Sequence, residues 1–312
     1  MRIIRGLKNL RPIKNSSVAV GVFDGVHIGH RKIIRKVVRA AGKRGIPSVI
    51  LTFDPHPLKV LSAKSKAPSL ISLKHRMKLI EELGVDNLVV LNFTRLFSRI
   101  PAQIFVRNIL VKKIGAKAIF AGPGFYFGKG AEAGYALLGK LSCKSGFKVE
   151  MVRPVKVRGR VVSSSLIREY VSKGELGEAA ALLGRPVSVL GTVVKGTGLA
   201  RYLGYPTANV NPHHEAIPPT GVYAVRVKLG SRRFNGILNI GARPTFYGPA
   251  DKEPSIEVHI FDFGGDLYGK DVEIIFVKKI RQERKFRTIA DLIAQIKNDE
   301  KKALQIMGRV LI

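Results

Sequence analysis

The sequence predicts two domains: an α/β domain built on a Rossmann-like parallel sheet, then a small antiparallel β-barrel with a C-terminal helix. The chain has 312 residues, which is more than one typical domain. Apolar strand-like runs alternate with helical patterns in its first half, as in a parallel sheet covered by helices. After Gly184-Arg185-Pro186 short strand-like runs separated by turns dominate, which favours a barrel. We therefore place the domains at residues 1–184 and 185–312.

The first domain is predicted element by element from apolar periodicity and from the glycines and prolines that interrupt it. The expected strands are residues 18–23, 47–53, 88–93, 116–121 and 148–152. The expected helices are residues 33–41, 74–83, about 101–114, about 131–142, 166–170 and 176–183. Pro101 suits the first turn of its helix, and Gly84 and Gly115 suit helix ends.

The second domain is predicted from short runs that Gly, Pro and Asn turns separate. The expected strands are residues 187–194, 222–229, 234–240, 256–261 and 272–277. A single helix is expected from about residue 289 to residue 307. Neither an internal repeat nor a low-complexity linker is visible, so the connection near residue 184 is short.

Composition narrows the class of protein. With 46% hydrophobic residues the chain can bury a substantial core. No apolar stretch approaches the roughly 20 residues of a membrane span, and the N-terminus lacks the apolar region of a signal peptide. The single Cys143 excludes an intramolecular disulfide framework and a cysteine-rich zinc site. We expect a cytoplasmic protein without a membrane partner.

The net charge of +32 and the pI of about 10.6 resemble those of a nucleic-acid binder. However, the cations are spread through predicted helices and loops, and no basic tail is visible. The charge fits anionic nucleotide substrates or simple solubility equally well. We therefore expect nucleic-acid binding to be weak and non-specific.

Two histidines follow the first predicted strand. Asp24 and Gly25 turn the chain there, and His27 and His30 come before the first helix. This junction is where a parallel sheet binds ligands, because helix N-terminal amides point at an anion. Two imidazoles at this place suit the α-phosphate of a nucleotide, which gathers charge in the transition state. The alternative is a capping turn whose histidines are merely exposed.

A second group of polar residues lies near the end of the first domain. Ser163 and Ser164 begin a predicted helix, and Arg168 follows one turn later. Hydroxyls, free amides and a guanidinium fork could hold the β- and γ-phosphates that leave as pyrophosphate. In isolation the segment is an ordinary helix cap followed by a surface arginine. The two histidines favour the phosphate site.

The second domain contains a possible Mg²⁺ site. The glycines Gly196 and Gly198 precede Thr207 and Asn209, which are two residues apart. In an extended segment such residues point the same way, so hydroxyl and amide oxygens can share one cation. Mg²⁺ favours such oxygen ligands together with water and phosphates. A glycine-rich hairpin with Thr and Asn in its turn is the alternative.

The first domain resembles bacterial FAD synthetases. The pattern Gly-x-Phe-Asp-Gly-x-His-x-Gly-His matches residues 21–30, and residues 163–168 resemble the family's Ser-Ser-Thr/Ser-x-Ile-Arg. Residues 53–57 are similar to a Phe-x-Pro-His-Pro segment that lines the flavin site in the family. Gly124 departs from the family, because it stands where a polar Asp or Asn is usual. The His-Ile-Gly-His tetrapeptide also occurs in class I aminoacyl-tRNA synthetases.

The second domain resembles riboflavin kinases in five segments that occur in the family's order. These segments are residues 196–209, 239–246, 257–263, 266–269 and 281–286, with Ala200 in place of a usual glycine. The resemblance covers nearly the whole chain and implies a bifunctional riboflavin kinase/FAD synthetase. It would phosphorylate riboflavin to FMN with ATP and Mg²⁺, and then join FMN to AMP with release of pyrophosphate. Its partners would be small molecules: ATP, riboflavin and FMN.

The resemblance also implies residue roles. Glu257 would be the kinase base, and we expect His259 on the opposite face of the same strand, with a lesser role. The residues implied are, for catalysis, Glu257, His27, His30 and Arg168; for nucleotide binding, Gly21, Phe23, Asp24, Gly25, Ser163, Ser164, Gly196, Gly198 and Pro206; for flavin binding, Pro55, His56, Pro57, Arg281 and Glu283; and for metal, Thr207 and Asn209.

Two alternatives remain from the sequence. Because of Gly124, the first domain could bind nucleotide without transferring it, leaving a riboflavin kinase alone. A nucleotidyltransferase that acts on tRNA or another nucleic acid would explain the charge and the tetrapeptide. Against it, no Lys-Met-Ser-Lys-Ser segment follows, and the motifs of the second domain would be unexplained.

Overall fold

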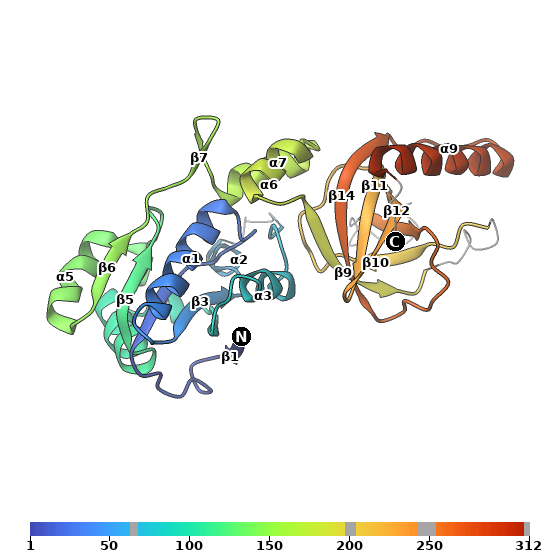
Figure 1. Cartoon of the computed structure of the whole chain (residues 1–312). Coiled ribbons are helices and arrows are strands. Elements are labelled where there is room, and N and C mark those ends of the chain that lie inside the picture. The colour runs from blue at the N-terminus through green and yellow to red at the C-terminus, as the bar shows by residue number, and fades with distance from the viewer. Residues whose placement is uncertain (63–67, 197–203, 242–253, 309–312) are drawn as a thin grey trace. The chain divides into compact units, whose positions relative to one another are not determined.

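The computed structural model describes residues 1–62, 68–196, 204–241 and 254–308 (Figure 1). The chain forms two compact units, Met1–Ser69 with Leu73–Ser164, and Leu70–Ser72 with Ser165–Ile312. The second unit includes most of α6 (Ser164–Lys173) and all of α7 (Leu176–Leu183). The expected domain boundary at residue 184 stays a prediction.

The first unit is built on a parallel sheet with the strand order β1-β4-β3-β2-β5-β6. The strands are β1 (Arg2–Arg5), β2 (Ser16–Val20), β3 (Ser48–Asp54), β4 (Asn87–Asn92), β5 (Ala116–Ala121) and β6 (Lys148–Met151). The chain proceeds from β2 to β3 and β4 on one side, and then to β5 and β6 on the other. The order therefore reverses between β2 and β5, and such a reversal opens a crevice at the carboxyl ends of the strands.

Helices cover this sheet. They are α1 (Ile28–Gly42), α2 (Pro57–Leu61), α3 (Leu73–Glu81), α4 (Ala102–Ile104) and α5 (Tyr135–Ser145). Helix α1 packs against β2, β3 and β5, because Ile34, Val37 and Ala41 form its buried face. The helix expected over residues 101–114 is instead a short α4 followed by a π-helix, Phe105–Lys113. Apolar periodicity does not separate these two helix types.

The parallel sheet was thus predicted correctly from its central strands, whereas three peripheral elements were missed. These elements are the edge strand β1, the short helix α2 and the hairpin of β7 (Lys156–Val157) and β8 (Arg160–Val161). Each of these strands and this helix is five residues or shorter, so its apolar pattern is too brief to recognise.

The second unit contains a closed barrel in the order β10-β13-β12-β11-β14-β9. Its strands are β9 (Ser188–Val194), β10 (Ala208–Asn211), β11 (Gly221–Leu229), β12 (Arg232–Gly241), β13 (Ser255–Ile260) and β14 (Asp271–Arg281). The C-terminal helix α9 (Ile289–Met307), red in Figure 1, packs against β11, β12 and β14. Its buried Ala303 and Met307 join Ala224, Ile237 and Phe261 in one apolar cluster. The expected barrel and helix are confirmed, although β10 was not among the five strands expected from the sequence.

Among the residues that the structure describes, no helix is both long enough and apolar enough to cross a membrane.

We predict that Gly115→Ala destabilises the first unit more than Gly84→Ala. Both glycines end a helical segment with a positive φ, and that conformation costs an L-residue roughly 1–2 kcal/mol. A Cβ on Gly115 would also lie 2.1 Å from the Ile13 carbonyl oxygen, whereas nothing lies within 4 Å of one on Gly84. Urea unfolding of the two variants measures the difference, and equal losses would contradict the clash.

Candidate functional site

The His27 and His30 rings lie at the reversal point of the parallel sheet, directly after β2. His27 is buried and caps α1, because its Nδ1 accepts a hydrogen bond of 3.2 Å from the His30 amide. The two rings stack with their centroids 3.6 Å apart, and His30 meets the edge of Phe23 at 5.3 Å. Since Nδ1 of His27 is an acceptor here, its proton is on Nε2.

Arg76 of α3 lies beside these histidines, and the sequence analysis did not identify it. Its buried guanidinium donates to the Val22 carbonyl and, at 3.2 Å, to the hydroxyl of Thr52, so it ties the end of β3 to the chain after β2. Burial lowers the pKa of Arg76, while Asp24 and Asp54 act in the opposite direction. No local pattern distinguishes Arg76 from the other cations of its helix.

His30 is neutral at physiological pH in this environment. Burial, followed by the neighbouring His27 and Arg76, lowers the pKa of His30 well below the ordinary value of an imidazole. Its buried Nδ1 has no hydrogen-bond partner in the structure. His30 is therefore a neutral hydrogen-bonding group, and Arg76 supplies a nearby positive charge.

The start of α6 is hydrogen-bonded to residues 21–30, which follow β2, include both histidines and are called the histidine loop. The Ser164 hydroxyl donates a hydrogen bond of 2.9 Å to the carbonyl oxygen of Asp24, and Ser163 immediately precedes it. Arg168 follows one turn later in α6, on the part counted with the second unit. The Ser164 hydroxyl thus holds the loop together in this structure, while its oxygen keeps the ability to accept.

Residues 122–124 follow β5, across the reversal point from the histidine loop. A Cβ on Gly122 would lie 3.2 Å from Ile33 of α1, so the chain runs close to this helix. Nothing lies within 4 Å of the Cβ position of Gly124. The departure from the family pattern at Gly124 therefore leaves open space at the edge of the crevice.

The Pro55-His56-Pro57 segment leaves β3 at the same edge of the sheet. His56 caps the short helix α2, because its Nδ1 accepts from the Leu58 amide at 3.1 Å. Pro57 occupies the first position of that helix, and Pro55 lies exposed before it. The segment is therefore a rigid edge at the end of β3, next to β2, the strand that precedes the two histidines.

A cavity of about 400 Å³ lies in the second unit, between barrel strands, residues 281–286 and α9. It brings together most of the polar residues that the sequence singled out in this half of the chain. They are Thr207, Asn209, Asn239, Glu257, His259, Arg281 and Glu283. Apolar and aromatic side chains complete its wall: Tyr205, Val222, Ile237, Leu238, Phe286, Leu292 and Ile296.

Strand pairing places Glu257 between two amides. Asn209 of β10 lies opposite Glu257 of β13, and Asn239 of β12 lies opposite it on the other side. Partial burial raises the pKa of Glu257 above the ordinary value of a glutamate. The Glu257 carboxylate is therefore a stronger base than an exposed glutamate, and it lies at the wall of the cavity.

The expectation that His259 faces away from Glu257 is wrong. Residues two apart in a strand point to the same side, and both side chains line the same cavity. The His259 Nδ1 lies 2.8 Å from the Pro206 carbonyl oxygen, and because a carbonyl only accepts, this nitrogen carries the proton. His259 therefore fixes the backbone that leads into Thr207 and Asn209.

Gly196 gives room to Asn209. A Cβ at residue 196 would lie 2.0 Å from the Asn209 amide nitrogen, so any other residue there would displace the Asn209 side chain. Gly198 and Ala200 lie outside the described residues. A second hollow of about 690 Å³ lies beyond β10 and β13, where Pro206, Ala208 and the loop 263–268 line it. Thr207 lines both hollows, so it stands between two possible ligand sites.

Oxygen donors for a cation are present in this region, although the described residues contain no cluster of His, Cys, Asp and Glu that could hold a metal ion. The Thr207 hydroxyl and the Asn209 amide border the cavity beside the Glu257 carboxylate. Such neutral oxygens suit Mg²⁺ when phosphates and water complete its coordination. The residues therefore fit that ion.

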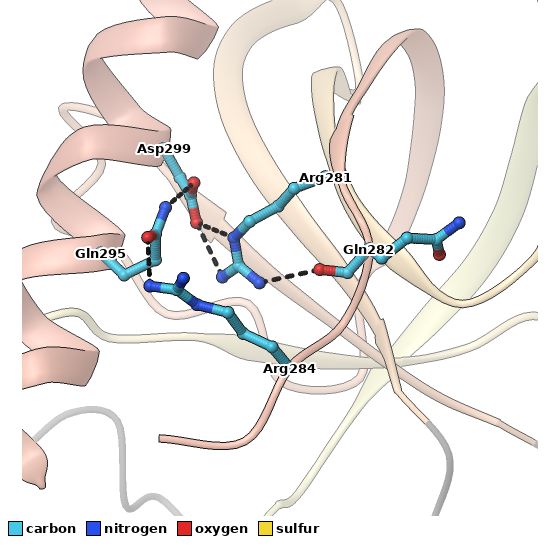
Figure 2. A network of polar contacts seen from close by, with 5 residues as sticks. All are labelled: Arg281, Gln282, Arg284, Gln295 and Asp299. Atoms are coloured by element: carbon cyan, nitrogen blue, oxygen red, sulfur yellow. Dashed lines mark hydrogen bonds and ion pairs between the residues drawn. The ribbon is translucent and has the colours of Figure 1, made fainter. Parts of the chain in front are cut away.

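Arg281 and Glu283 lie along one wall of the cavity. Arg281 is ion-paired with Asp299 of α9, and the distance from its Nη2 to the Asp299 Oδ2 is 2.8 Å (Figure 2). A Cβ on Gly241 would lie 2.8 Å from the Glu283 carboxylate. Asp299 was not identified from the sequence, because it occurs in a helix whose other acids are ordinary surface residues.

Comparison with known proteins gives consistent results for both halves. A family model described as FAD synthetase matches residues 11–166, and one described as riboflavin kinase matches residues 183–307. The Escherichia coli K12 protein named bifunctional riboflavin kinase/FMN adenylyltransferase is 37% identical, covering 99% of this chain and 98% of that protein. The Bacillus subtilis protein of the same name is 36% identical, covering 95% and 93%.

A solved structure is similar to this chain over both folds. The Streptococcus pneumoniae chain, whose structure is titled a macrolide-efflux protein, has a TM-score of 0.84 and 31% identity, with 97% of this chain and 99% of that chain covered. The matches extend over both the histidine loop and the Glu257 cavity. The chain therefore belongs to the family of bifunctional riboflavin kinases/FMN adenylyltransferases.

Proposed function

We propose that the chain makes FAD from riboflavin in two steps. The second domain transfers the γ-phosphoryl group of ATP to the 5′-hydroxyl of riboflavin, and the first domain joins the resulting FMN to the AMP part of ATP. The observation that carries the first step is the row of Asn209, Glu257 and Asn239 beside Thr207 at one cavity wall. Residues 1–184 and 185–312 are the domains that we assign to these activities.

In the kinase step Glu257 accepts the proton of the riboflavin hydroxyl while the hydroxyl oxygen attacks the γ-phosphorus. ADP leaves with the electron pair of the broken phosphoanhydride bond. The pKa of Glu257, which burial raises, brings its basicity closer to working pH. Thr207 and Asn209 would hold Mg²⁺, which neutralises phosphate charge when bound. The place of Thr207 between two hollows supports flavin on the side of Phe286 and nucleotide on the side of residues 263–268.

Other residues shape the two kinase sites. The backbone near Gly196 and Gly198 would approach the phosphates, and Pro206 is held by His259 at the entry to β10. Arg281 and Glu283 would border the flavin. The aromatic and aliphatic wall of the cavity suits a flat, largely apolar ring system, as ligand cavities commonly do.

In the adenylyl transfer a phosphate oxygen of FMN attacks the α-phosphorus of ATP, and pyrophosphate leaves. The FMN phosphate is ionised at neutral pH, so no base is required. His27 and His30 would stabilise the oxygens that gain charge in the transition state. The nucleotide would contact Gly21, Phe23, Asp24 and Gly25 after β2, and its leaving pyrophosphate would contact Ser163, Ser164 and Arg168. Pro55, His56 and Pro57 would border the flavin.

We propose a cytoplasmic location, with ATP, riboflavin and FMN as partners and only weak, non-specific binding of nucleic acid. The positive charge then serves solubility and the attraction of anionic substrates. A kinase whose first domain only binds nucleotide is the second candidate, because Gly124 leaves open space at the crevice where the family has a polar side chain.

We predict that the purified chain with riboflavin, ATP and Mg²⁺ forms FMN first and FAD afterwards, with stoichiometric pyrophosphate. Chromatography separates the three flavins, and a coupled assay counts pyrophosphate. The experiment is repeated with reduced flavin under anaerobic conditions. If FMN accumulates and neither FAD nor pyrophosphate forms with either redox state, the first domain is not an adenylyltransferase.

We predict that Glu257→Gln slows FMN formation by about 10²–10⁴-fold, because the amide keeps the shape and removes the basicity. FAD formation from supplied FMN should stay near that of the parent chain, which serves as the internal control for folding. In the parent chain, FMN formation should decline on the acid side at a higher pH than the ordinary glutamate value of about 4.3. An unchanged rate of FMN formation in the variant would place the base elsewhere.

We predict that the first domain loses stability as the pH falls below about 6.5, the ordinary pKa of histidine. The pKa of His30 is lower in the folded chain than in the unfolded chain. The unfolded chain therefore binds the proton first, so folding is favoured above that pH and progressively less below it. In His30→Gln this acid-side loss should be smaller. Urea unfolding at pH 7.5, 6.5 and 5.5 measures it, and identical losses in both chains would exclude His30 as the cause.

A further inference from the structure

The segment after β14 is held to α9 by one buried carboxylate. Asp299 has no exposed surface, and its Oδ2 receives the Arg281 Nε and Nη2, each at 2.8 Å. The remaining Arg281 nitrogen, Nη1, donates to the Gln282 carbonyl at 3.0 Å. Figure 2 shows the guanidinium turned toward α9 along this contact. All three Arg281 nitrogens thus have partners within the protein.

The network extends to a second arginine of the same segment. The other oxygen of Asp299 accepts from the Gln295 amide nitrogen at 2.7 Å, one turn earlier in α9. The Gln295 amide oxygen in turn accepts from Arg284 (Figure 2). A buried carboxylate therefore orients both arginines, one directly and one through Gln295. Such a buried charge adds little stability by itself, yet breaking the pair leaves an uncompensated charge.

Both arginines lie close to one aromatic ring of the cavity wall. The Arg281 guanidinium carbon is 5.6 Å from the centroid of the Phe286 ring, and that of Arg284 is 4.7 Å away. Both lie within the range of cation–π attraction. Phe286 and Glu283 line the same 400 Å³ cavity as Glu257. The position of this wall thus depends on contacts that begin at Asp299.

We propose that Asp299 is a positioning residue for the flavin ring: through Arg281 and Arg284 it holds Phe286 at the cavity wall, which all four residues line. This rests on the proposed kinase function of that cavity. Asp299 acts on substrate binding and not on the transferred phosphoryl group, because its partners belong to the wall and not to the row of Glu257. Arg281 accordingly serves mainly to hold the wall, since each of its three nitrogens already donates to Asp299 or Gln282.

The test is the steady-state kinetics of Asp299→Asn, which keeps the shape and removes the charge. We expect the KM for riboflavin to rise at least about tenfold, equal to ~1.4 kcal/mol. The KM for ATP and kcat at saturating riboflavin should change less than twofold. A fluorescence titration of riboflavin without ATP should show the same loss of affinity. Unchanged riboflavin affinity in the folded variant would overturn the proposal.

A matched control separates positioning from general loosening of α9. Met307→Ala removes apolar packing from the same helix without touching the network. Both variants are compared at temperatures equally far below their own Tm, and riboflavin KM should rise only in Asp299→Asn. An equal rise in both would mean that helix packing alone sets the affinity. Should Asp299→Asn fail to fold, Gln295→Met removes the link from Asp299 to Arg284 and keeps the Asp299–Arg281 pair. It should raise the same KM by a smaller factor, and no rise would overturn the proposal.

A double-mutant cycle tests the route. If Asp299 acts through Arg281, then Arg281→Gln and Asp299→Asn together should cost little more riboflavin affinity than either alone. Additive losses would show that Arg281 contacts the flavin independently, and would overturn the route. A parent chain that neither binds nor phosphorylates riboflavin would instead refute the proposed function, a result that is distinct from either outcome.

Discussion

Pairing between three barrel strands is the constraint on which the second half of the chain depends. Because β10, β13 and β12 are in register, Asn209, Glu257 and Asn239 form one row across the cavity wall. A shift of a single residue in β13 would turn Glu257 to the opposite face of the strand. Gly196 and His259 protect this arrangement, one by leaving space for the Asn209 amide and the other by holding the Pro206 carbonyl.

The first half uses a different constraint for a related purpose. Its strand order reverses between β2 and β5, so the histidine loop and residues 122–124 face each other across the reversal. His27 completes α1 as its cap, and Arg76 ties the chain after β2 to β3. In both halves, backbone contacts thus fix the polar groups before any ligand arrives, as effective electrostatic stabilisation requires.

The sequence predicted what short-range patterns encode. The central strands and α9 follow from apolar periodicity, and the histidine loop follows from its glycines and its place after a strand. Arg76 and Asp299 could not be identified in this way. Thr52 lies 24 residues from Arg76 and Arg281 lies 18 residues from Asp299, so only folding brings each pair together. The wrong prediction for His259 has another cause. Strand periodicity alone places His259 on the same face as Glu257, because the two residues are two apart on β13.

The scarcity of acidic residues gives these contacts a further meaning. The chain has 54 Lys and Arg but only 22 Asp and Glu, so most cations lack an acidic partner and must be solvated. Yet Asp24 and Asp299 are buried, each close to an arginine that is itself largely withdrawn from solvent. A buried guanidinium needs a nearby carboxylate to offset its lost hydration. The few acids are therefore informative in this protein: where one is buried beside an arginine, it marks a wall or loop whose position matters to a cavity or crevice.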